Sequence, residues 1–205
     1  PVSYSVVDQK VQVSKIIKES FEIIDVNRST ALKSIAKLIK NSEIIGILLE
    51  NSETGPRALG NRSLICNGKD HDAVNRLNTV IKNRSPFRPT APAMRESTAR
   101  KYYSLNPALL DSYKSMSATC KCLPGSEAES FPVTHVDGTA RLQTVEKETF
   151  LDDLLEQLIP FNIEILANSS LNMSGDPTCF DLFDGLMVCE RTPLRYIFTD
   201  IGLLR

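Results

Sequence analysis

Basic residues gather in two short stretches in the middle of the chain that are rich in Gly and Pro. The first is Thr54–Ser63 (TGPRALGNRS), and the second is Lys82–Pro92 (KNRSPFRPTAP). A guanidinium group presents a planar fork of N–H donors that pairs with phosphate or carboxylate oxygens. Pro and Gly fix the backbone that carries these side chains. The two stretches therefore predict a site for a phosphorylated small molecule, with Arg57, Arg62, Lys82, Arg84 and Arg88 as the available cations.

The distribution of charge supports a local anion site. The chain of 205 residues has a formal net charge of −1. Between Thr54 and Ser104, ten Lys and Arg residues stand against three Asp and Glu residues, whereas the remainder holds 14 and 22. A protein that coats nucleic acid is usually basic overall, so this pattern favours a small anionic ligand.

Composition indicates the general class of protein. Hydrophobic residues make up 41% of the chain and charged residues 24%, with no long apolar run, which is typical of a globular protein without a membrane span. Five scattered cysteines favour a reducing compartment, so we expect a cytoplasmic protein. Cys120 and Cys122 have no second Cys/His pair at metal spacing, since the only histidines are His71 and His135, and no structural zinc is expected.

Apolar periodicity predicts alternating helices and strands. Helices are expected from Arg28 to Ile39, Asp70 to Ile81, Phe150 to Leu158 and Phe180 to Cys189. Strands are expected at Ile44–Leu49, Thr139–Val145, Ile163–Ala167 and as a closing pair in Tyr196–Leu204, while Ser104–Ser130 reads as irregular. This order is typical of an α/β fold.

Two further polar loops follow apolar elements later in the chain. They are Thr134–Gln143 (THVDGTARLQ) and Asn168–Pro177 (NSSLNMSGDP). Ligands of open α/β sheets bind where strands end, so the four loops are predicted to meet at one pocket. The chain lacks a G-x-x-x-x-G-K-[ST] motif. A nucleotide would therefore be held by Arg and Lys side chains and by Ser and Asn hydrogen bonds.

The four motifs, in this order and spacing, resemble the C-terminal region of the NodU/CmcH-type O-carbamoyltransferases, a family that includes tobramycin carbamoyltransferase. The resemblance runs from about Leu32 to the C-terminus, which makes residues 32–205 the family domain. Residues 1–31 would be a lead-in segment, the tail of or linker from an N-terminal domain outside this sequence.

A second resemblance concerns the fold. YrdC-like domains carry a K-x-R pair and an S-x-N-x-S-G loop, which match Lys82-Asn-Arg84 and Ser170–Gly175 here. The resemblance implies a YrdC-like α/β fold, with a twisted mixed β-sheet and flanking helices around a concave nucleotide site.

The family resemblance implies a two-stage reaction. Carbamoyl phosphate and ATP, with Mg²⁺, first give carbamoyl-adenylate in the YrdC-like domain. A separate N-terminal domain of the actin/Hsp70-like class, which holds an iron-type metal through histidines, then moves the carbamoyl group to an acceptor hydroxyl. The two histidines of this chain do not supply that metal cluster, so the chain resembles the activating half; a homodimer is compatible with this reading, and the acceptor is not specified.

The resemblance also implies roles for individual residues. Arg57 is expected to bind the carbamoyl phosphate oxygens, and Arg141 the carbamoyl end or its phosphate. Lys82 and Arg84 are expected to bind the ATP phosphates, and Arg88 either to bind the same phosphates or to brace its loop. Thr134 and His135 are expected to bind the carbamoyl oxygen. Triphosphate or Mg²⁺ is expected to be bound by Asn168, Ser170 and Asn172. No metal held by the protein alone is expected.

Other interpretations remain open at this point. Arg62 is as well explained by pairing with Glu50 or Glu53, and Asp137 by orienting its own turn. The fourth loop reads NSSLN where the family usually has NTSFN, so adenine packing is expected to differ. A non-catalytic YrdC-like module that binds nucleotide or RNA is the alternative function, and a regulatory domain that binds only its partner is a third.

Overall fold

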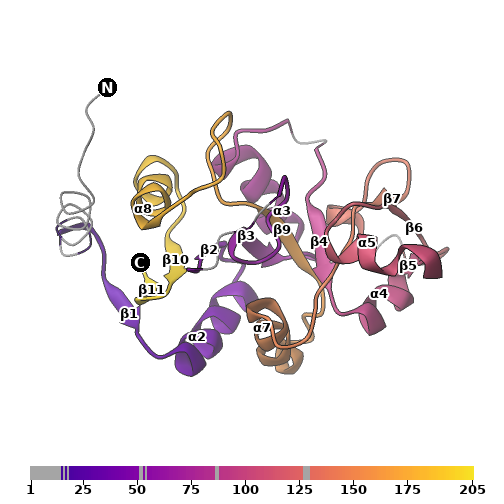
Figure 1. Cartoon of the computed structure of the whole chain (residues 1–205), viewed down its shortest axis with the longest axis horizontal. Coiled ribbons are helices and arrows are strands. Elements are labelled where there is room, and N and C mark those ends of the chain that lie inside the picture. Colours follow the sequence, from indigo (N-terminus) through magenta and orange to yellow (C-terminus); the bar gives the residue numbers. More distant parts are fainter. Residues whose placement is uncertain are drawn as a thin grey trace.

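A mixed eight-stranded sheet runs through the centre of the molecule (Figure 1). The computed structural model describes residues 15, 17, 19–50, 53, 55–85, 88–126 and 130–205. In spatial order the strands are β1 (Ile23–Asp25), β11 (Gly202–Leu204), β10 (Tyr196–Thr199), β2 (Ile45–Leu48), β3 (Arg62–Asn67), β9 (Leu166–Ser170), β4 (Ala91–Met94) and β8 (Gln143–Thr144). The pairs β10–β2 and β4–β8 are parallel, and the other pairs are antiparallel.

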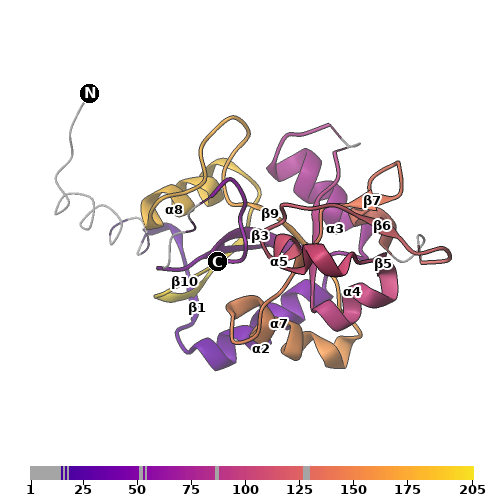
Figure 2. The same ribbon diagram turned by 45° about the vertical axis from the view of Figure 1, so that its right-hand side comes forward.

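Helices cover both faces of this sheet. They are α2 (Arg28–Lys40), α3 (His71–Arg76), α4 (Glu96–Tyr102), α5 (Leu110–Lys114), α7 (Phe150–Leu158) and α8 (Leu182–Arg191). Helix α3 continues into a π-helical turn at Leu77–Ile81, and short 3₁₀ turns lie at Pro107–Leu109, Phe131–Val133 and Ile159–Phe161. Figures 1 and 2 show α2 and α7 side by side on one face, with α3 and α8 on the other.

The two layers bury separate apolar clusters. Ile35 and Ile39 of α2 pack with Leu154 and Leu158 of α7 on one face of the sheet, and all four side chains are buried. Both helices start at side-chain caps, because Asn27 accepts from Ser29 N and Thr149 accepts from Asp152 N. The second cluster lies under α3 and α8 on the opposite face. The result is a three-layer α/β arrangement.

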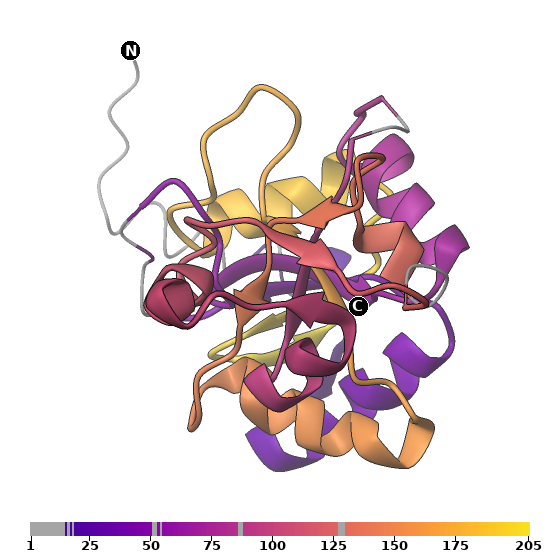
Figure 3. The ribbon, with the colours of Figure 1, turned by 90° about the vertical axis from the view of Figure 1, so that its right-hand side faces the viewer.

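A smaller three-stranded sheet extends the molecule at the end near α4 and α5. It is formed by β5 (Tyr103–Ser104), β6 (Cys120–Cys122) and β7 (Thr139–Ala140), and it faces the viewer in Figure 3. The sequence predicted an irregular Ser104–Ser130, which is wrong for β6 and α5. These elements are only three and five residues long, which is too short for periodicity to reveal them.

Most predicted elements are confirmed, and two differ. The predicted strand at Thr139–Val145 is divided, because β7 belongs to the small sheet and β8 to the large one. The predicted strand at Ile163–Ala167 lies three residues later, as β9, and therefore includes the polar Asn168–Ser170. The apolar run was visible in the sequence, but hydrogen bonding to β3 sets where the strand ends. In the described part of the chain, no helix is long and apolar enough to cross a membrane.

Candidate functional site

The four predicted loops meet beside the central strands. The segment that carries Arg57 leads into β3, which pairs with β9. The fourth loop begins at the end of β9, and Arg84 lies after the π-helical turn. Arg141 lies between β7 and β8, where the chain passes from one sheet to the other. Residues far apart in sequence are thus brought together by neighbouring strands.

A partly buried carboxylate organises the first loop. Glu53 Oε1 accepts hydrogen bonds from Leu59 N and Asn61 N, both at 2.7 Å, and Oε2 accepts from Arg62 N at 3.2 Å. Burial raises the pKa of Glu53, and the three backbone donors oppose that rise. The carboxylate therefore fixes the backbone that presents Arg57.

Arg62 has a structural role. Its side chain is 4% exposed and donates to carbonyl oxygens of Leu49, Cys179 at 3.0 Å and Phe180 at 3.1 Å. These bonds tie the first loop to the segment before α8. The structural interpretation is confirmed, but the side chain reaches main-chain carbonyls, and only its backbone N–H reaches Glu53.

Two buried amide side chains hold the loop from its other side. Gln143 Nε2 donates to Leu59 O at 2.7 Å, and Asn168 Nδ2 donates to Ala58 O at 3.0 Å. Asn168 Nδ2 also donates to Gln143 Oε1 at 2.7 Å. Since Ala58 follows Arg57 directly, this pair fixes the position from which the Arg57 side chain extends.

Three arginines line one small cavity, which we call the arginine chamber. It has a volume of about 70 Å³ and is lined by Arg57, Arg84, Arg141, Pro56, Ala58, Pro89, Thr90, Ala91, Met116, Asn168, Ser169 and Ser170. No carboxylate is among these lining residues. Burial and the neighbouring guanidinium groups lower the pKa values of Arg84 and Arg141. Uncompensated positive charge of this kind attracts an anion.

Hydrogen bonding within the chamber leaves donors available. Arg84 Nη1 lies 3.2 Å from Ser169 Oγ, which is the side-chain contact the structure gives for this guanidinium. Arg141 Nε is buried and has no hydrogen-bond partner among the residues that the structure describes. A buried polar group without a partner costs free energy unless a ligand or water satisfies it. The chamber is therefore arranged to receive oxygen acceptors.

Lys82 is placed behind the chamber wall. Its side chain is fully buried, and Nζ donates to Ser170 O at 2.8 Å, Asn172 O at 2.7 Å and Asn172 Oδ1 at 2.5 Å. Burial and the charge of Arg84 lower the pKa of Lys82 to about 7. In this structure the ammonium group holds the fourth loop, and its predicted contact with ATP phosphates stays a prediction.

The fourth loop is closed by its own side chains. Ser170 Oγ donates to Asn172 Oδ1 at 2.6 Å, and Asn172 Nδ2 donates to Asp176 O at 2.5 Å. Ser170 lines the arginine chamber, whereas Asn172 does not. The Ser170 hydroxyl hydrogen is therefore used within the loop, and Asn172 shapes the turn behind it.

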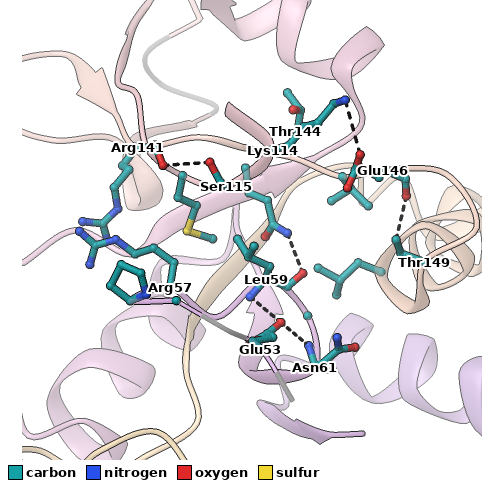
Figure 4. Close-up of a pocket in the computed structure, with 18 of the residues that line it drawn as sticks. Glu53, Arg57, Leu59, Asn61, Lys114, Ser115, Arg141, Thr144, Glu146 and Thr149 are labelled. Carbon is teal, nitrogen blue, oxygen red and sulfur yellow. Dashed lines mark hydrogen bonds and ion pairs between the residues drawn. The ribbon is translucent and has the colours of Figure 1, made fainter. Parts of the chain in front are cut away.

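A larger cavity of about 730 Å³ opens next to the chamber (Figure 4). The two share Pro56, Arg57, Met116 and Arg141 as lining residues. Figure 4 shows the Arg57 and Arg141 side chains extending together at one end of the larger cavity, with Glu146 at the other. A connected space of this size has room for a nucleoside beside a phosphate group.

Sequence reasoning missed part of this larger cavity. Residues 114–119, from the segment predicted to be irregular, line it, and Lys114 Nζ lies 3.5 Å from Glu146 Oε1. Glu53, considered only as a partner for Arg62, also lines it. The one available signal was the basic and polar composition of 114–119 after an apolar run.

Three predicted site residues lie elsewhere. Arg88 and Thr134 line a separate cavity of about 400 Å³ with His71, on the far side of Pro89 from the chamber. Thr134 Oγ1 donates to Ser130 O at 2.8 Å, and His135 Nδ1 lies 3.2 Å from Thr139 Oγ1. The structure gives these residues local contacts, and their predicted contact with ligand stays a prediction. Asp137 orients its own turn as expected, accepting from Thr139 N at 2.9 Å.

The residues around the chamber offer little to a protein-held metal. Among the residues that the structure describes, no group of three or more His, Cys, Asp or Glu is placed to hold a metal ion. Glu53 is occupied by three backbone donors, and Glu146 by Lys114. Mg²⁺ prefers carboxylates together with substrate phosphates. The donor set thus fits Mg²⁺ that arrives on ATP better than a resident ion.

The family model described as Carbamoyltransferase C-terminus matches residues 36–205. The chain belongs to this family. Nodulation protein NolO from Bradyrhizobium diazoefficiens is 32% identical over 186 residues, which cover 89% of this chain and 34% of that protein. The 3'-hydroxymethylcephem-O-carbamoyltransferase of Streptomyces clavuligerus is 37% identical over 142 residues, covering 67% of this chain and 26% of that protein. The chain therefore spans about a third or less of these relatives.

Solved structures identify the fold as YrdC-like. Full-length HypF in a phosphate- and nucleotide-bound form superposes with a TM-score of 0.56 at 21% identity, covering 77% of this chain and 23% of that one. Sua5 of P. abyssi complexed with L-threonine gives a TM-score of 0.57 at 16% identity, covering 79% and 44%. The predicted YrdC-like α/β fold, with a mixed sheet and flanking helices, is confirmed.

Proposed function

We propose that this carbamoyltransferase C-terminal domain binds carbamoyl phosphate and ATP at the arginine chamber and the adjoining cavity, and forms carbamoyl-adenylate. The observation that carries the proposal is the convergence of Arg57, Arg84 and Arg141 on a chamber without a lining carboxylate. Both substrates are phosphorylated, so each needs its negative charge neutralised. Because the chain belongs to the carbamoyltransferase family, we take the carbamoyl group to be the group that is activated and transferred.

The reaction balances in two displacements. Water first cleaves the bond between phosphorus and the carbamoyl oxygen, which gives carbamate and inorganic phosphate. A carbamate oxygen then attacks the α-phosphorus of ATP, and pyrophosphate leaves with Mg²⁺. Such transfers depend on positioning and charge neutralisation more than on covalent help from the protein. Arg57 and Arg141 would hold the first substrate where the two cavities meet, and Arg84 would bind phosphates.

The second stage belongs to the rest of the protein. We place transfer to the acceptor hydroxyl in a separate N-terminal actin/Hsp70-like domain, because this chain spans about a third or less of its curated relatives. The acceptor is then a small molecule chosen by that domain. This chain's own task ends with the activated carbamoyl group.

Pyrophosphate release tests the proposal. The 205-residue chain with carbamoyl phosphate, ATP and Mg²⁺ should release pyrophosphate and inorganic phosphate together, and omission of carbamoyl phosphate should stop both. Arg57→Ala should abolish release, since it removes a guanidinium shared by both cavities. Arg195→Ala is the matched control, because Arg195 pairs with Glu43 away from the site. Folded protein that binds ATP but releases no pyrophosphate would make the chain a non-catalytic nucleotide-binding module.

A further inference from the structure

The arginine chamber contains an acceptor as well as donors without partners. In the described part of the chain, three buried side-chain polar atoms have no hydrogen-bond partner: Ser63 Oγ, Arg141 Nε and Asn168 Oδ1. Arg141 and Asn168 both line the chamber. Native structures rarely leave buried polar atoms unpaired, and two on the wall of one small cavity call for a common explanation.

The orientation of the Asn168 amide is fixed by its neighbours. Gln143 Nε2 donates to Leu59 O, so Gln143 Oε1 is the atom that faces Asn168. Both hydrogens of Asn168 Nδ2 are then used, one by Gln143 Oε1 and the other by Ala58 O. Reversing the Asn168 amide would set its oxygen against two other oxygens. The free atom is therefore the carbonyl oxygen, which accepts and does not donate.

A ligand that pairs with both Arg141 Nε and Asn168 Oδ1 needs an acceptor for the first atom and a donor for the second. Phosphate esters present only oxygen acceptors at neutral pH, which suits Arg141 Nε but leaves Asn168 Oδ1 unpaired. A carbamoyl group carries both an NH₂ donor and a carbonyl acceptor.

We propose that Asn168 Oδ1 accepts a hydrogen bond from the carbamoyl NH₂ group, while Arg141 Nε donates to an oxygen of the same ligand, so that Asn168 selects carbamoyl phosphate against acyl phosphates. The inference rests on the proposed function and adds how the site selects its substrate. Asn168 is 2% exposed and lies on β9 between β3 and β4, so its amide is held rigidly. A buried acceptor discriminates strongly, because an analogue without the donor leaves it unsatisfied.

Acetyl phosphate is the informative probe, because it replaces the NH₂ of carbamoyl phosphate by CH₃ and keeps its size and phosphate. We expect the wild-type chain to bind carbamoyl phosphate at least tenfold more tightly than acetyl phosphate in calorimetric titrations. In Asn168→Ala this ratio should fall to near one. Gln143→Glu is the matched control: it replaces the amide donor to Leu59 O but keeps an oxygen that accepts from Asn168 Nδ2, so both ligands should bind more weakly with the ratio retained.

The outcomes separate this inference from the proposed function. Equal affinity of the wild-type chain for the two phosphates overturns the inference, and this measurement does not depend on the folding of any variant. An unchanged ratio in a folded Asn168→Ala variant overturns it as well. If wild type still releases pyrophosphate in either case, the proposed function stands and only the role of Asn168 fails. Absence of binding of both phosphates overturns the two together.

Discussion

Two groups of charged residues in this molecule use arginine in opposite ways. At the α4–α7 contact, Arg95 lies between two carboxylates, with Nε 2.7 Å from Asp152 Oδ1 and Nη1 2.9 Å from Glu156 Oε2. Hydrogen bonds to these acids raise the pKa of Arg95 against the effect of burial. In the arginine chamber no carboxylate is present, and burial lowers the pKa values of Arg84 and Arg141.

The difference separates a structural site from a binding site. An arginine whose charge is matched within the fold contributes to stability and has little left for a ligand. Guanidinium groups gathered without acids cost free energy in the empty protein and regain it when an anion binds. The comparison predicts opposite consequences for removing one arginine from each group.

Removal of Arg141 should give the largest effect. In Arg141→Leu we expect pyrophosphate release to fall by about 100–1,000-fold, or roughly 3–4 kcal/mol of transition-state stabilisation, because a buried donor to the ligand is lost. The free energy of unfolding should stay the same or rise, because a partly buried charge is removed that has no carboxylate among the described residues lining the chamber. Chemical denaturation and a pyrophosphate assay on one preparation measure both. A variant that loses stability and keeps activity would place Arg141 in the structural class.

Lys82 is an intermediate case between the paired Arg95 and the arginines of the chamber, because its ammonium group donates to neutral oxygen atoms. Because its pKa falls from 10.5 to about 7 on folding, the unfolded chain binds more protons than the folded chain between these values. Stability from this group is therefore fully present above the unfolded pKa and is lost as pH falls through the folded pKa. Relative to Lys82→Met, wild type should gain roughly 2 kcal/mol between about pH 7 and pH 9.

Denaturant titrations of both proteins across this range measure the difference in unfolding free energy. Subtracting the variant removes contributions from other groups that titrate in the same range. A difference that stays flat with pH would mean that Lys82 keeps an ordinary pKa in the fold.

Arg95 should behave as the reverse of Arg141. In Arg95→Ala we expect the free energy of unfolding to fall by about 1 kcal/mol, because the two partly exposed salt bridges to Asp152 and Glu156 are lost. Pyrophosphate release should match wild type. Asp152→Asn tests the same contact from its other side and should lower stability by a similar amount. An activity loss in either variant with stability intact would break the distinction between paired and unpaired arginines.

How much of this could be read from the sequence differs between the two groups. Arg57 and Arg84 were visible because they lie in short basic stretches, with Gly55 and Pro56 before Arg57 and Pro86 after Arg84. The pairing of Arg95 with Asp152 and Glu156 was not, since 57 or more residues separate them and only the packing of α4 near α7 joins them. Local composition predicts a cluster of charge, and the tertiary fold decides which charges are neutralised.

The same reason explains the contacts within the fold that other predicted site residues make. Asn168 and Lys82 are of types that suit ligand binding, but their donors are used within the fold. Asn168 donates to Ala58 and Gln143, and Lys82 donates to Ser170 and Asn172. These partners are distant in sequence from their donors. Residues 114–119 show the opposite case, since their polar composition does not by itself distinguish cavity lining from an exposed loop. Strand pairing with Ile65 and Ala91 places Asn168 at the chamber, and no single-sequence pattern contains that register.

Binding of inorganic phosphate alone should give the smallest effect and still distinguish the two groups. An anion that binds only the folded chain stabilises it by about 0.4 kcal/mol when its concentration equals the dissociation constant, or roughly 1–2 °C in midpoint for a domain of this size. Wild type and Arg95→Ala should both show this shift in thermal unfolding, whereas Arg141→Leu should not, because it removes one of the three arginines that line the chamber, while Arg95 is paired with carboxylates. Sodium chloride at matched ionic strength is the control for screening. A shift of equal size in all three proteins would mean that phosphate acts on general surface charge, and the chamber would lose its status as the anion site.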